Sequence, residues 1–198
     1  MKEKVYDLEF CFKGDRTYVH GTDIYNKTLE IFSNDMKDEK FDLSFHGVVK
    51  KNILLSNIRP EDEDLIKFVC KYNGENDERK IFYGIERDLN IDCRYAYPEN
   101  DICQLSDLDF ETKAVNLHKD TSYSFVENCV ALNKYLLENL FPDVDGKWYF
   151  TRLQLSKTQL KNAYPLKLSF KANFNFKLLK TEIFVADQFV GYIYFSLV

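Results

Sequence analysis

A short phrase occurs twice in this chain, and the repeat constrains the fold more than any other feature. The first copy reads Tyr-Asp-Leu-Glu-Phe at Tyr6–Phe10, and the second reads Ser-Asp-Leu-Asp-Phe at Ser106–Phe110. Each copy precedes one helical pattern and then several strand-like segments. The spacing exceeds the roughly 20–50 residues of solenoid repeats. The repeat therefore predicts two tandem copies of one α+β unit, with coincidence as the alternative.

Aromatic residues are frequent in this chain, whereas glycine and proline are rare. The 198 residues include 17 Phe and 13 Tyr, against 7 Gly and 4 Pro. Aromatic side chains favour the half-buried surface of a pleated sheet. Because Gly and Pro are few, we expect few long loops and no glycine-rich phosphate-binding loop. The composition predicts a β-rich protein with long strands.

Charge and cysteine spacing argue against several classes of protein. A net charge of −5 disfavours nucleic acid as the partner, because phosphate binding needs a basic face. The N-terminus lacks the apolar core of a signal peptide, and no segment approaches the ~20 apolar residues of a membrane span. The cysteines are scattered and lack the paired spacing of zinc sites. We expect a cytoplasmic protein without metal or other cofactor, with most cysteines reduced and buried.

The hydrophobic pattern gives the same order of elements in both halves. The first half predicts a helix over 22–32 and strands over 5–13, 41–55, 65–72, 80–86 and 89–97. The second predicts a helix over 125–141 and strands over 107–117, 147–157, 166–178, 181–186 and 189–198. Both halves thus read as a strand, a helix and a meander of strands. We expect one unit at residues 1–97, a linker at 98–106 and a second unit at 107–198.

The second helix has the clearest pattern in the chain. Its apolar residues form a wide stripe with a 3.6-residue period. Ser124 and Glu127 fit a capping box at its start, and Pro142 follows its end. Asn133 in this helix occupies the place that Asn26 occupies in the first helix, which supports the duplication.

This order of elements resembles the hotdog fold, in which a curved antiparallel sheet wraps one central helix. Two tandem copies resemble a double hotdog, in which one chain imitates the usual dimer. The resemblance covers nearly the whole chain and rests on element order and the internal repeat. It implies an α+β pseudo-dimer of two hotdog units. The alternative is an α+β scaffold of another topology.

Hotdog proteins mostly handle acyl thioesters carried by coenzyme A or an acyl carrier protein, as thioesterases or dehydratases. The resemblance therefore implies a dehydratase-like or thioesterase-like activity on such a substrate, in a chain that could form homo-oligomers of pseudo-dimers. The other reading is a non-catalytic acyl-binding or protein-interaction module with a decayed site. Family sites lie between two units, near the start of the central helix.

His20 is the best candidate for a catalytic base. Dehydratases of the family place a histidine just before the first helix, and His20 lies in that region. Its side chain could remove an α-proton. Gly21 could bring a backbone N–H to the thioester carbonyl at the helix N-terminus, and Asp23 could contact the substrate. The structural alternative makes Gly21 a turn residue, lets Thr22 or Asp23 cap the helix, and leaves His20 on the surface.

Glu127 is the second catalytic candidate, because it lies at the start of the second helix. Dehydratases place an acidic residue on the partner's helix, so Glu127 could face His20 across a pseudo-dimer. The structural alternative is that Glu127 only completes the capping box.

Other polar residues are candidates for substrate binding or for structural roles. Asn128 and Asn133 lie on the second helix, and Arg152 could bind a phosphate of coenzyme A or form an ion pair on the sheet. We expect structural roles for His46, His118 and Cys129.

The catalytic signatures of the family are missing. The dehydratase segment H-x-x-G-x-P-x-x-P-G and the thioesterase Gly-His-Val-Asn-Asn segment do not occur. Only the first half carries a His-Gly before its helix, and only the second has the Glu-capped start. If the chain has one working site, this asymmetry predicts that the site is built from both halves and occurs once per chain.

Overall fold

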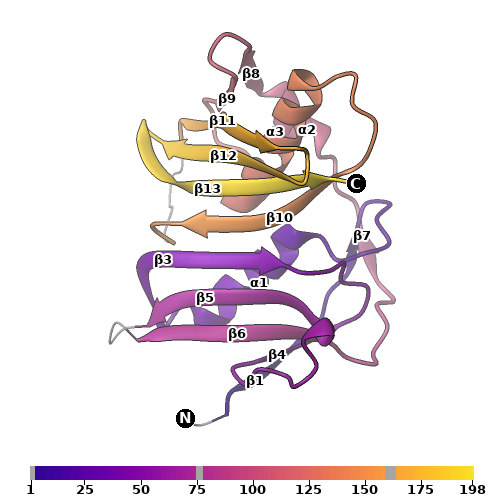
Figure 1. Cartoon of the computed structure of the whole chain (residues 1–198). Helices are drawn as coiled ribbons and strands as arrows, with labels where there is room; N and C mark the ends of the chain where they lie inside the picture. Colours follow the sequence, from indigo (N-terminus) through magenta and orange to yellow (C-terminus); the bar gives the residue numbers. More distant parts are fainter. Residues whose placement is uncertain (1–2, 75–77, 159–163) are drawn as a thin grey trace. The chain divides into compact units, whose positions relative to one another are not determined.

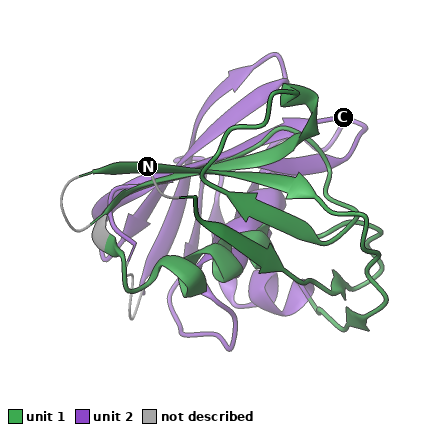
Figure 2. Ribbon diagram, turned by 90° about the horizontal axis from the view of Figure 1, so that it is seen from below, with its two compact units in different colours: residues 1–98 green, residues 99–198 purple. Residues whose placement is uncertain are grey.

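The chain divides into two compact units. The computed structural model describes residues 3–74, 78–158 and 164–198. Unit 1 is Met1–Pro98 and unit 2 is Glu99–Val198, shown in different colours in Figure 2. Each unit contains an antiparallel sheet and one long helix.

Unit 1 is built on a five-stranded antiparallel sheet in the order β1-β4-β6-β5-β3 (Figure 1). A second, two-stranded sheet pairs β2 with β7 in parallel. The elements are β1 (Val5–Leu8), β2 (Phe12–Lys13), α1 (Gly21–Phe32), β3 (Met36–Phe45), β4 (Ile53–Ser56), the 3-10 helix η1 (Glu63–Leu65), β5 (Ile66–Gly74), β6 (Arg79–Glu86) and β7 (Arg94–Tyr95).

Unit 2 contains six antiparallel strands in the order β10-β13-β12-β11-β9-β8. Its long helix α3 packs against β9, β11 and β13. The elements are α2 (Asn100–Gln104), β8 (Ser106–Asp109), β9 (Ala114–Leu117), α3 (Phe125–Leu140), β10 (Trp148–Leu155), β11 (Leu166–Phe174), β12 (Leu178–Val185) and β13 (Gln188–Leu197).

The strands that follow the long helix are connected differently in the two units. In unit 2, β11, β12 and β13 form the predicted meander of sequential neighbours. In unit 1, β4 pairs with β1 and β6, and β5 lies between β6 and β3. The chain therefore passes from β4 to β5 through η1 instead of through a hairpin. The expectation of a simple meander in the first half is wrong.

Each long helix buries one apolar face. Phe32 at the end of α1 lies 4.6 Å from the ring of Tyr72 and 4.5 Å from that of Phe82, between ring centroids. In α3, Leu132 and Leu136 are fully or almost fully buried. Such burial of aromatic and aliphatic groups is the main stabilising contribution of a core.

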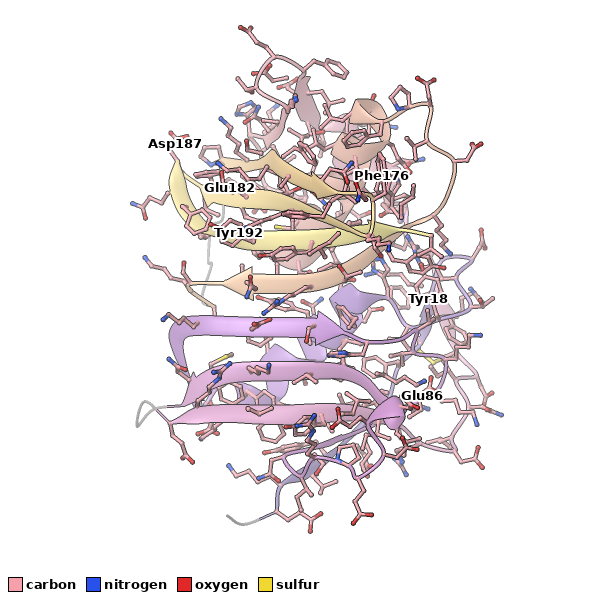
Figure 3. All side chains as sticks on the ribbon, viewed as in Figure 1. Tyr18, Glu86, Phe176, Glu182, Asp187 and Tyr192 are labelled. Carbon is pink, nitrogen blue, oxygen red and sulfur yellow. A yellow bond between two sulfur atoms is a disulfide. The ribbon has the colours of Figure 1, made fainter. Side chains whose placement is uncertain are left out.

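The outer face of the unit 2 sheet is more polar than its inner face. Leu166 and Leu168 of β11 are buried, while the residues between and after them are partly exposed. Glu182 of β12 and Tyr192 of β13 are cross-strand partners, and Asp187 lies in the turn between these strands (Figure 3). This alternation agrees with the sequence pattern at the start of β11, whereas Phe174 at its end is exposed.

Several predicted strands are shorter or divided. Segment 5–13 forms β1 and β2, segment 41–55 contains parts of β3 and β4, and segment 89–97 retains only β7. Segment 107–117 is a hairpin, because Asp109 accepts hydrogen bonds from the backbone of Glu111 and Thr112 and starts a turn. Segment 166–178 turns back at Asn175 and Phe176, which both have positive φ.

The segment expected to be a linker, 98–106, contains helix α2. Ile102 of α2 is fully buried, and α2 packs against α3. This segment is therefore part of the core of unit 2.

The cysteines depart from the expectation that most are reduced and buried. Cys11 and Cys93 form a disulfide that joins positions 82 residues apart in the sequence. Cys70 and Cys129 are buried free thiols, and Cys103 is half-buried. Among the described residues, no helix is long and apolar enough to cross a membrane.

Candidate functional site at the start of helix α1

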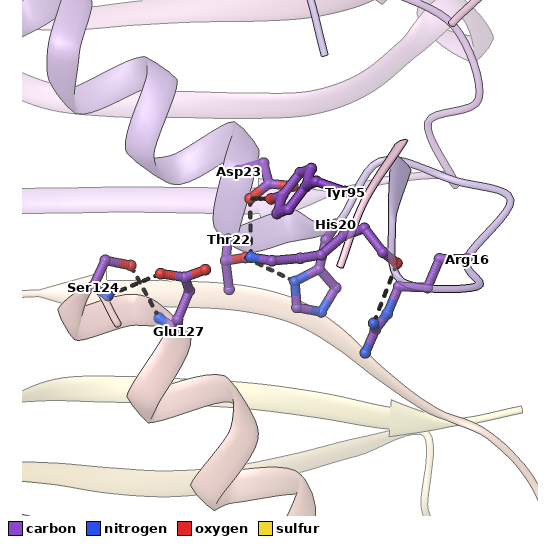
Figure 4. A network of polar contacts seen from close by, with 8 residues as sticks. Arg16, His20, Thr22, Asp23, Tyr95, Ser124 and Glu127 are labelled. Carbon is purple, nitrogen blue, oxygen red and sulfur yellow. Dashed lines mark hydrogen bonds and ion pairs between the residues drawn. The ribbon is translucent and has the colours of Figure 1, made fainter. Parts of the chain in front are cut away.

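A fully buried lysine organises the polar residues at the start of α1 (Figure 4). Lys13 Nζ donates to Thr22 Oγ1 and to Asp23 Oδ1, each at 3.0 Å. The same ammonium lies 4.2 Å from the centre of the Tyr97 ring, which adds a cation–π contact. A buried charge is tolerated only when it is paired in this way.

The parallel pairing of β2 with β7 brings Tyr95 to this cluster. Lys13 and Tyr95 are register partners, and the Tyr95 hydroxyl donates to Asp23 Oδ1 at 2.8 Å. The Asp23 side chain is only 15% exposed. Its other oxygen, Oδ2, is buried without a hydrogen-bond partner among the residues that the structure describes. Asp23 therefore retains an acceptor that the described residues leave unused.

His20 lies directly before α1 and is buried, so the alternative that placed it on the surface is wrong. Its Nδ1 is 2.7 Å from Thr22 Oγ1, and its ring lies 6.1 Å from that of Tyr97. Because Thr22 accepts a hydrogen bond from Lys13, its hydroxyl hydrogen can be donated to Nδ1. In the other tautomer, Nδ1–H donates to the same oxygen, and Nε2 is then unprotonated and able to act as a base.

Gly21 is the first residue of α1. The first backbone N–H groups of a helix have no partner within the helix, and its dipole favours negative charge there. The start of α1 thus combines a histidine, a carboxylate and backbone donors within four consecutive residues.

Glu127 forms the capping box that the sequence predicts. The Ser124 backbone N–H donates to Glu127 Oε2 at 2.8 Å, and the Glu127 N–H donates to Ser124 Oγ at 3.4 Å (Figure 4). One carboxylate oxygen therefore serves the backbone at the start of α3. The pairing of Glu127 with His20 joins the two units and stays a prediction.

The two asparagines of α3 differ in their partners. Asn128 donates to the Tyr164 hydroxyl at 2.8 Å and accepts from the Thr121 hydroxyl at 2.9 Å, so it holds the preceding loop. Asn133 is fully buried, and neither side-chain atom has a hydrogen-bond partner among the described residues. A buried carboxamide without partners is costly and calls for an explanation.

The remaining candidates have other surroundings. Arg152 of β10 is half-buried, and its guanidinium lies 5.9 Å from the ring of Tyr194. His46 is exposed near Ser44, and His118 forms an exposed pair with Asp107 at 3.5 Å. Burial raises the pKa of the Cys129 thiol, so it is no nucleophile at neutral pH.

No group of three or more His, Cys, Asp or Glu side chains within the described ranges could hold a metal ion. The cluster at the start of α1 instead offers one imidazole, one carboxylate and one ammonium group. This set can exchange protons and bind a polar ligand.

Comparisons with known proteins identify the fold. No family model matches the sequence, and no curated protein matches it either. A solved tesB protein of Mycobacterium avium subspecies paratuberculosis matches with a TM-score of 0.52 and 9% identity, covering 99% of this chain and 92% of that one. The dehydratase domain of PpsC from Mycobacterium tuberculosis, in complex with C12:1-CoA, matches with a TM-score of 0.50 and 8% identity, covering 99% and 93%.

This chain has a hotdog fold. The likeness extends over nearly the whole chain, as the order of elements predicted. At such low identity it establishes the hotdog fold and leaves the chemistry to the residues of the site.

Sequence reasoning missed the polar partners that surround His20 in this hotdog chain. Lys13 was read as the end of a strand, and Tyr95 and Tyr97 were read as parts of another. Thr22 was considered only as a helix cap. A signal for Lys13 existed, since this lysine follows Phe10, Cys11 and Phe12 and directly precedes the Gly14 turn. Nothing in the sequence pattern indicated that the strand containing Tyr95 would pair with β2.

Proposed function

We propose that this chain binds or converts an acyl thioester carried by coenzyme A or an acyl carrier protein. Support comes from the hotdog fold, because one solved protein of this fold is a dehydratase domain in complex with an acyl-CoA. The observation that carries the proposal is the buried His20, whose Nδ1 lies 2.7 Å from Thr22 Oγ1 at the start of α1. A buried, oriented histidine beside a helix N-terminus suits proton transfer next to a polarised carbonyl.

A dehydratase-like reaction would use His20 as the base. His20 removes the α-proton of a 3-hydroxyacyl thioester, and the electron pair of that C–H bond forms the new C=C bond. The C–O bond to the hydroxyl breaks, and Glu127 supplies the proton with which it leaves as water. The Gly21 N–H would stabilise negative charge on the thioester oxygen. A thioesterase-like reaction would instead use His20 or Glu127 to activate water, which attacks the carbonyl and expels the thiol.

Substrate-binding roles fall to the other candidates. Asp23 and Asn128 would contact the substrate near the start of each helix. Asn133 would bind a polar atom of the acyl group, which would supply the hydrogen bonds that its buried carboxamide lacks among the described residues. Arg152 would bind a phosphate of coenzyme A.

A non-catalytic acyl-binding or interaction module is the second candidate. One observation favours it: a carboxylate oxygen of Glu127 accepts a hydrogen bond from the Ser124 backbone at 2.8 Å. A carboxylate held by the capping box is less available to protonate a leaving group. The missing catalytic signatures also agree with a decayed site.

We also propose that the chain is cytoplasmic, that its two units form a double-hotdog pseudo-dimer, and that these pseudo-dimers assemble into homo-oligomers. The Cys11–Cys93 disulfide counts against this location, because reducing compartments disfavour such bonds. Alkylation and mass spectrometry of the protein drawn directly from cells would decide the point. Two free thiols at these positions would support a reducing location.

The test is a screen of acyl-CoA and acyl-carrier substrates for thiol release and for enoyl formation. We expect turnover by the wild type and a loss of about 10²–10⁴-fold in His20→Ala, the usual contribution of a general base. His118→Ala, which changes an exposed histidine, should retain full activity. Substrate binding without turnover would favour the acyl-binding module. Neither binding nor turnover by the wild type would overturn the proposal.

A further inference from the structure

A hollow of about 610 Å³ lies beside α1 within unit 1. This volume falls in the range of roughly 300–1,000 Å³ that is typical of small-molecule sites. One wall comes from α1, and the others come from the segment between β1 and β2, from Asn52 and from the segment that leads into β7. His20 is not among the residues that line it, so the hollow differs from the proposed catalytic position.

The lining of this hollow is acidic. Among the described residues that line it, four carry carboxylates and one, Lys27, carries an ammonium group. Lys27 is already paired with Glu30 at 3.3 Å, and Asp23 is already paired with Lys13. Glu9 and Asp92 are exposed and form no ion pair with any described residue. The carboxylates of Glu9 and Asp92 thus remain for a ligand.

Neutral and apolar groups complete the lining. Asn26 and Asn90 contribute carboxamides that can accept or donate hydrogen bonds. Phe10, Ile91 and the Cys11–Cys93 disulfide supply an apolar surface, and Tyr95 adds an aromatic ring. A lining with both apolar groups and acceptors suits a ligand that has both a hydrocarbon part and a positive charge. Aromatic rings also attract cations through their faces.

Asp23 provides a separate indication that a donor is missing. Its Oδ1 accepts from Lys13 and Tyr95, whereas its Oδ2 is buried without a described partner. A carboxylate oxygen in this condition is a strong acceptor for a charged donor. An ammonium group that enters beside α1 would satisfy it after a small movement of the side chain.

We propose that the hollow beside α1 is a binding site for a small amphipathic organic cation, such as an aliphatic diamine or polyamine. Its charge excludes the phosphates of coenzyme A, which the carboxylates would repel. The site is therefore additional to the acyl-thioester function; the two proposals share Asp23, which the variants below leave unchanged.

Three six-carbon probes of similar length separate charge from size: hexamethylenediamine, hexanediol and adipate. We expect calorimetric titration to show binding of the diamine and of spermidine, and no binding of the diol or the dicarboxylate. Added salt should lower the affinity for the diamine, since exposed charges are screened within about 10 Å at 0.1 M. Equal binding of diamine and diol, or no binding of the diamine, would overturn the proposal.

A matched pair of double variants locates the site. Glu9→Gln with Asp92→Asn removes two exposed carboxylates from the lining. This double variant should lower the affinity for the diamine about tenfold or more, as expected for the loss of charge-assisted hydrogen bonds. Glu61→Gln with Asp64→Asn removes the same charge from the exposed loop at η1, and should leave the affinity unchanged. An equal loss in both double variants would mean non-specific attraction to an acidic protein and would overturn the assignment. None of these probes contains a thioester, so the result is independent of the acyl screen.

Discussion

Lys13 is the residue on which the start of α1 most depends. Its ammonium is completely removed from solvent and interacts with Thr22, Asp23 and the ring of Tyr97. Burying two opposite charges costs desolvation energy, and their attraction offsets it only when both partners are present. The pair is therefore a point where the loss of one member is more harmful than the loss of both.

Replacing Lys13 by methionine should destabilise the protein by about 3–5 kcal/mol, the usual cost of leaving one partner of a buried pair uncompensated. The measurement is urea unfolding followed by circular dichroism. The double variant Lys13→Met with Asp23→Asn should recover a large part of this loss. If the double variant is no more stable than Lys13→Met, the ion pair is not the cause.

Asp35 should make the stability sensitive to acid. Its pKa is lowered, first by the hydrogen bond from Lys80 and also by that from the Tyr72 hydroxyl. The folded state therefore keeps this carboxylate ionised at a pH where the unfolded chain, with a pKa of about 3.9, takes up a proton. The stabilisation is present above about pH 4 and is lost as the pH falls through the lower folded-state pKa.

The corresponding measurement is urea unfolding of Asp35→Asn across the acid range. We expect this variant to be less stable than the wild type at neutral pH, and the difference to shrink as the pH falls below about 4. Asp187→Asn changes an exposed carboxylate in the turn between β12 and β13, and should follow the wild type at every pH. A difference for Asp35→Asn that stays constant with pH would contradict the assignment.

Sequence reasoning reached part of this residue-level description. It found the capping box of Ser124 and Glu127, because that motif is local. It placed His20 at the start of α1 for the same reason. It could not find Lys13 with Tyr95, since these residues are far apart in the chain and meet only through the parallel pairing of β2 with β7.

At the scale of elements, the start of α3 allows the two roles of Glu127 to be separated. Glutamine can also complete a capping box, whereas alanine cannot. Glu127→Ala should therefore lose about 0.5–2 kcal/mol in urea unfolding, and Glu127→Gln should lose little. If Glu127 is also the proton donor, Glu127→Gln should lose the acyl-thioester activity while keeping its stability. Activity retained in Glu127→Gln would limit this residue to capping.

The contact between β10 and β13 depends on a glycine. A Cβ on Gly191 would lie 2.0 Å from the carbonyl oxygen of Gln154, which is backbone and cannot move aside easily. Gly191→Ala should destabilise the protein by roughly 1–3 kcal/mol or more through overpacking. Gly47→Ala is the control, because its Cβ would meet only the Lys67 side chain at 3.5 Å. Equal unfolding free energies for the two variants would contradict this account.

The long helices were easier to predict than the strands. Both α1 and α3 begin within one residue of the expected position, because periodicity and capping are encoded locally. The strand break at residues 9–11 contains neither Pro nor Gly, and the break at 46–52 contains only Gly47, so the predicted strands continued through both. Strand order was beyond the pattern altogether, since alternation gives the face of a residue but not its neighbouring strand.

At the scale of the whole chain, the two units differ in how their strands are connected, and the sequence repeat does not indicate this difference. Both place a short first strand, a helix and four further strands in an antiparallel sheet, but β4 and β5 of unit 1 are not hairpin partners as β11 and β12 are. Two units with one long helix each thus build antiparallel sheets of five and six strands with different connections. The sequence predicted one long helix and five strands for each half, whereas the described residues form seven strands in unit 1 and six in unit 2. Among these strands, the predicted meander of sequential neighbours occurs only at β11 to β13.

The disulfide should stabilise unit 1 selectively. Closing a loop of 82 residues removes conformational entropy from the unfolded chain, which corresponds to about 4–5 kcal/mol in the loop-entropy model. Cys11→Ser with Cys93→Ser should raise amide hydrogen exchange in unit 1. Cys103→Ser, which alters a free thiol of unit 2, should leave unit 1 unchanged. Unaltered exchange in the double variant would show that the bond does not stabilise unit 1.

The same bond changes how unit 1 would respond to mechanical tension. The loop between Cys11 and Cys93 contains α1 and the four strands from β3 to β6, which make up most of the main sheet of unit 1. A force that pulls on the two chain ends would pass across the sulfur–sulfur bond and leave the enclosed residues unloaded. A single peptide cut inside this loop would likewise leave both fragments covalently attached. The residues between Cys11 and Cys93 would extend under force only after a reductant has opened the disulfide. The two fragments of a cleaved loop would likewise separate only after reduction.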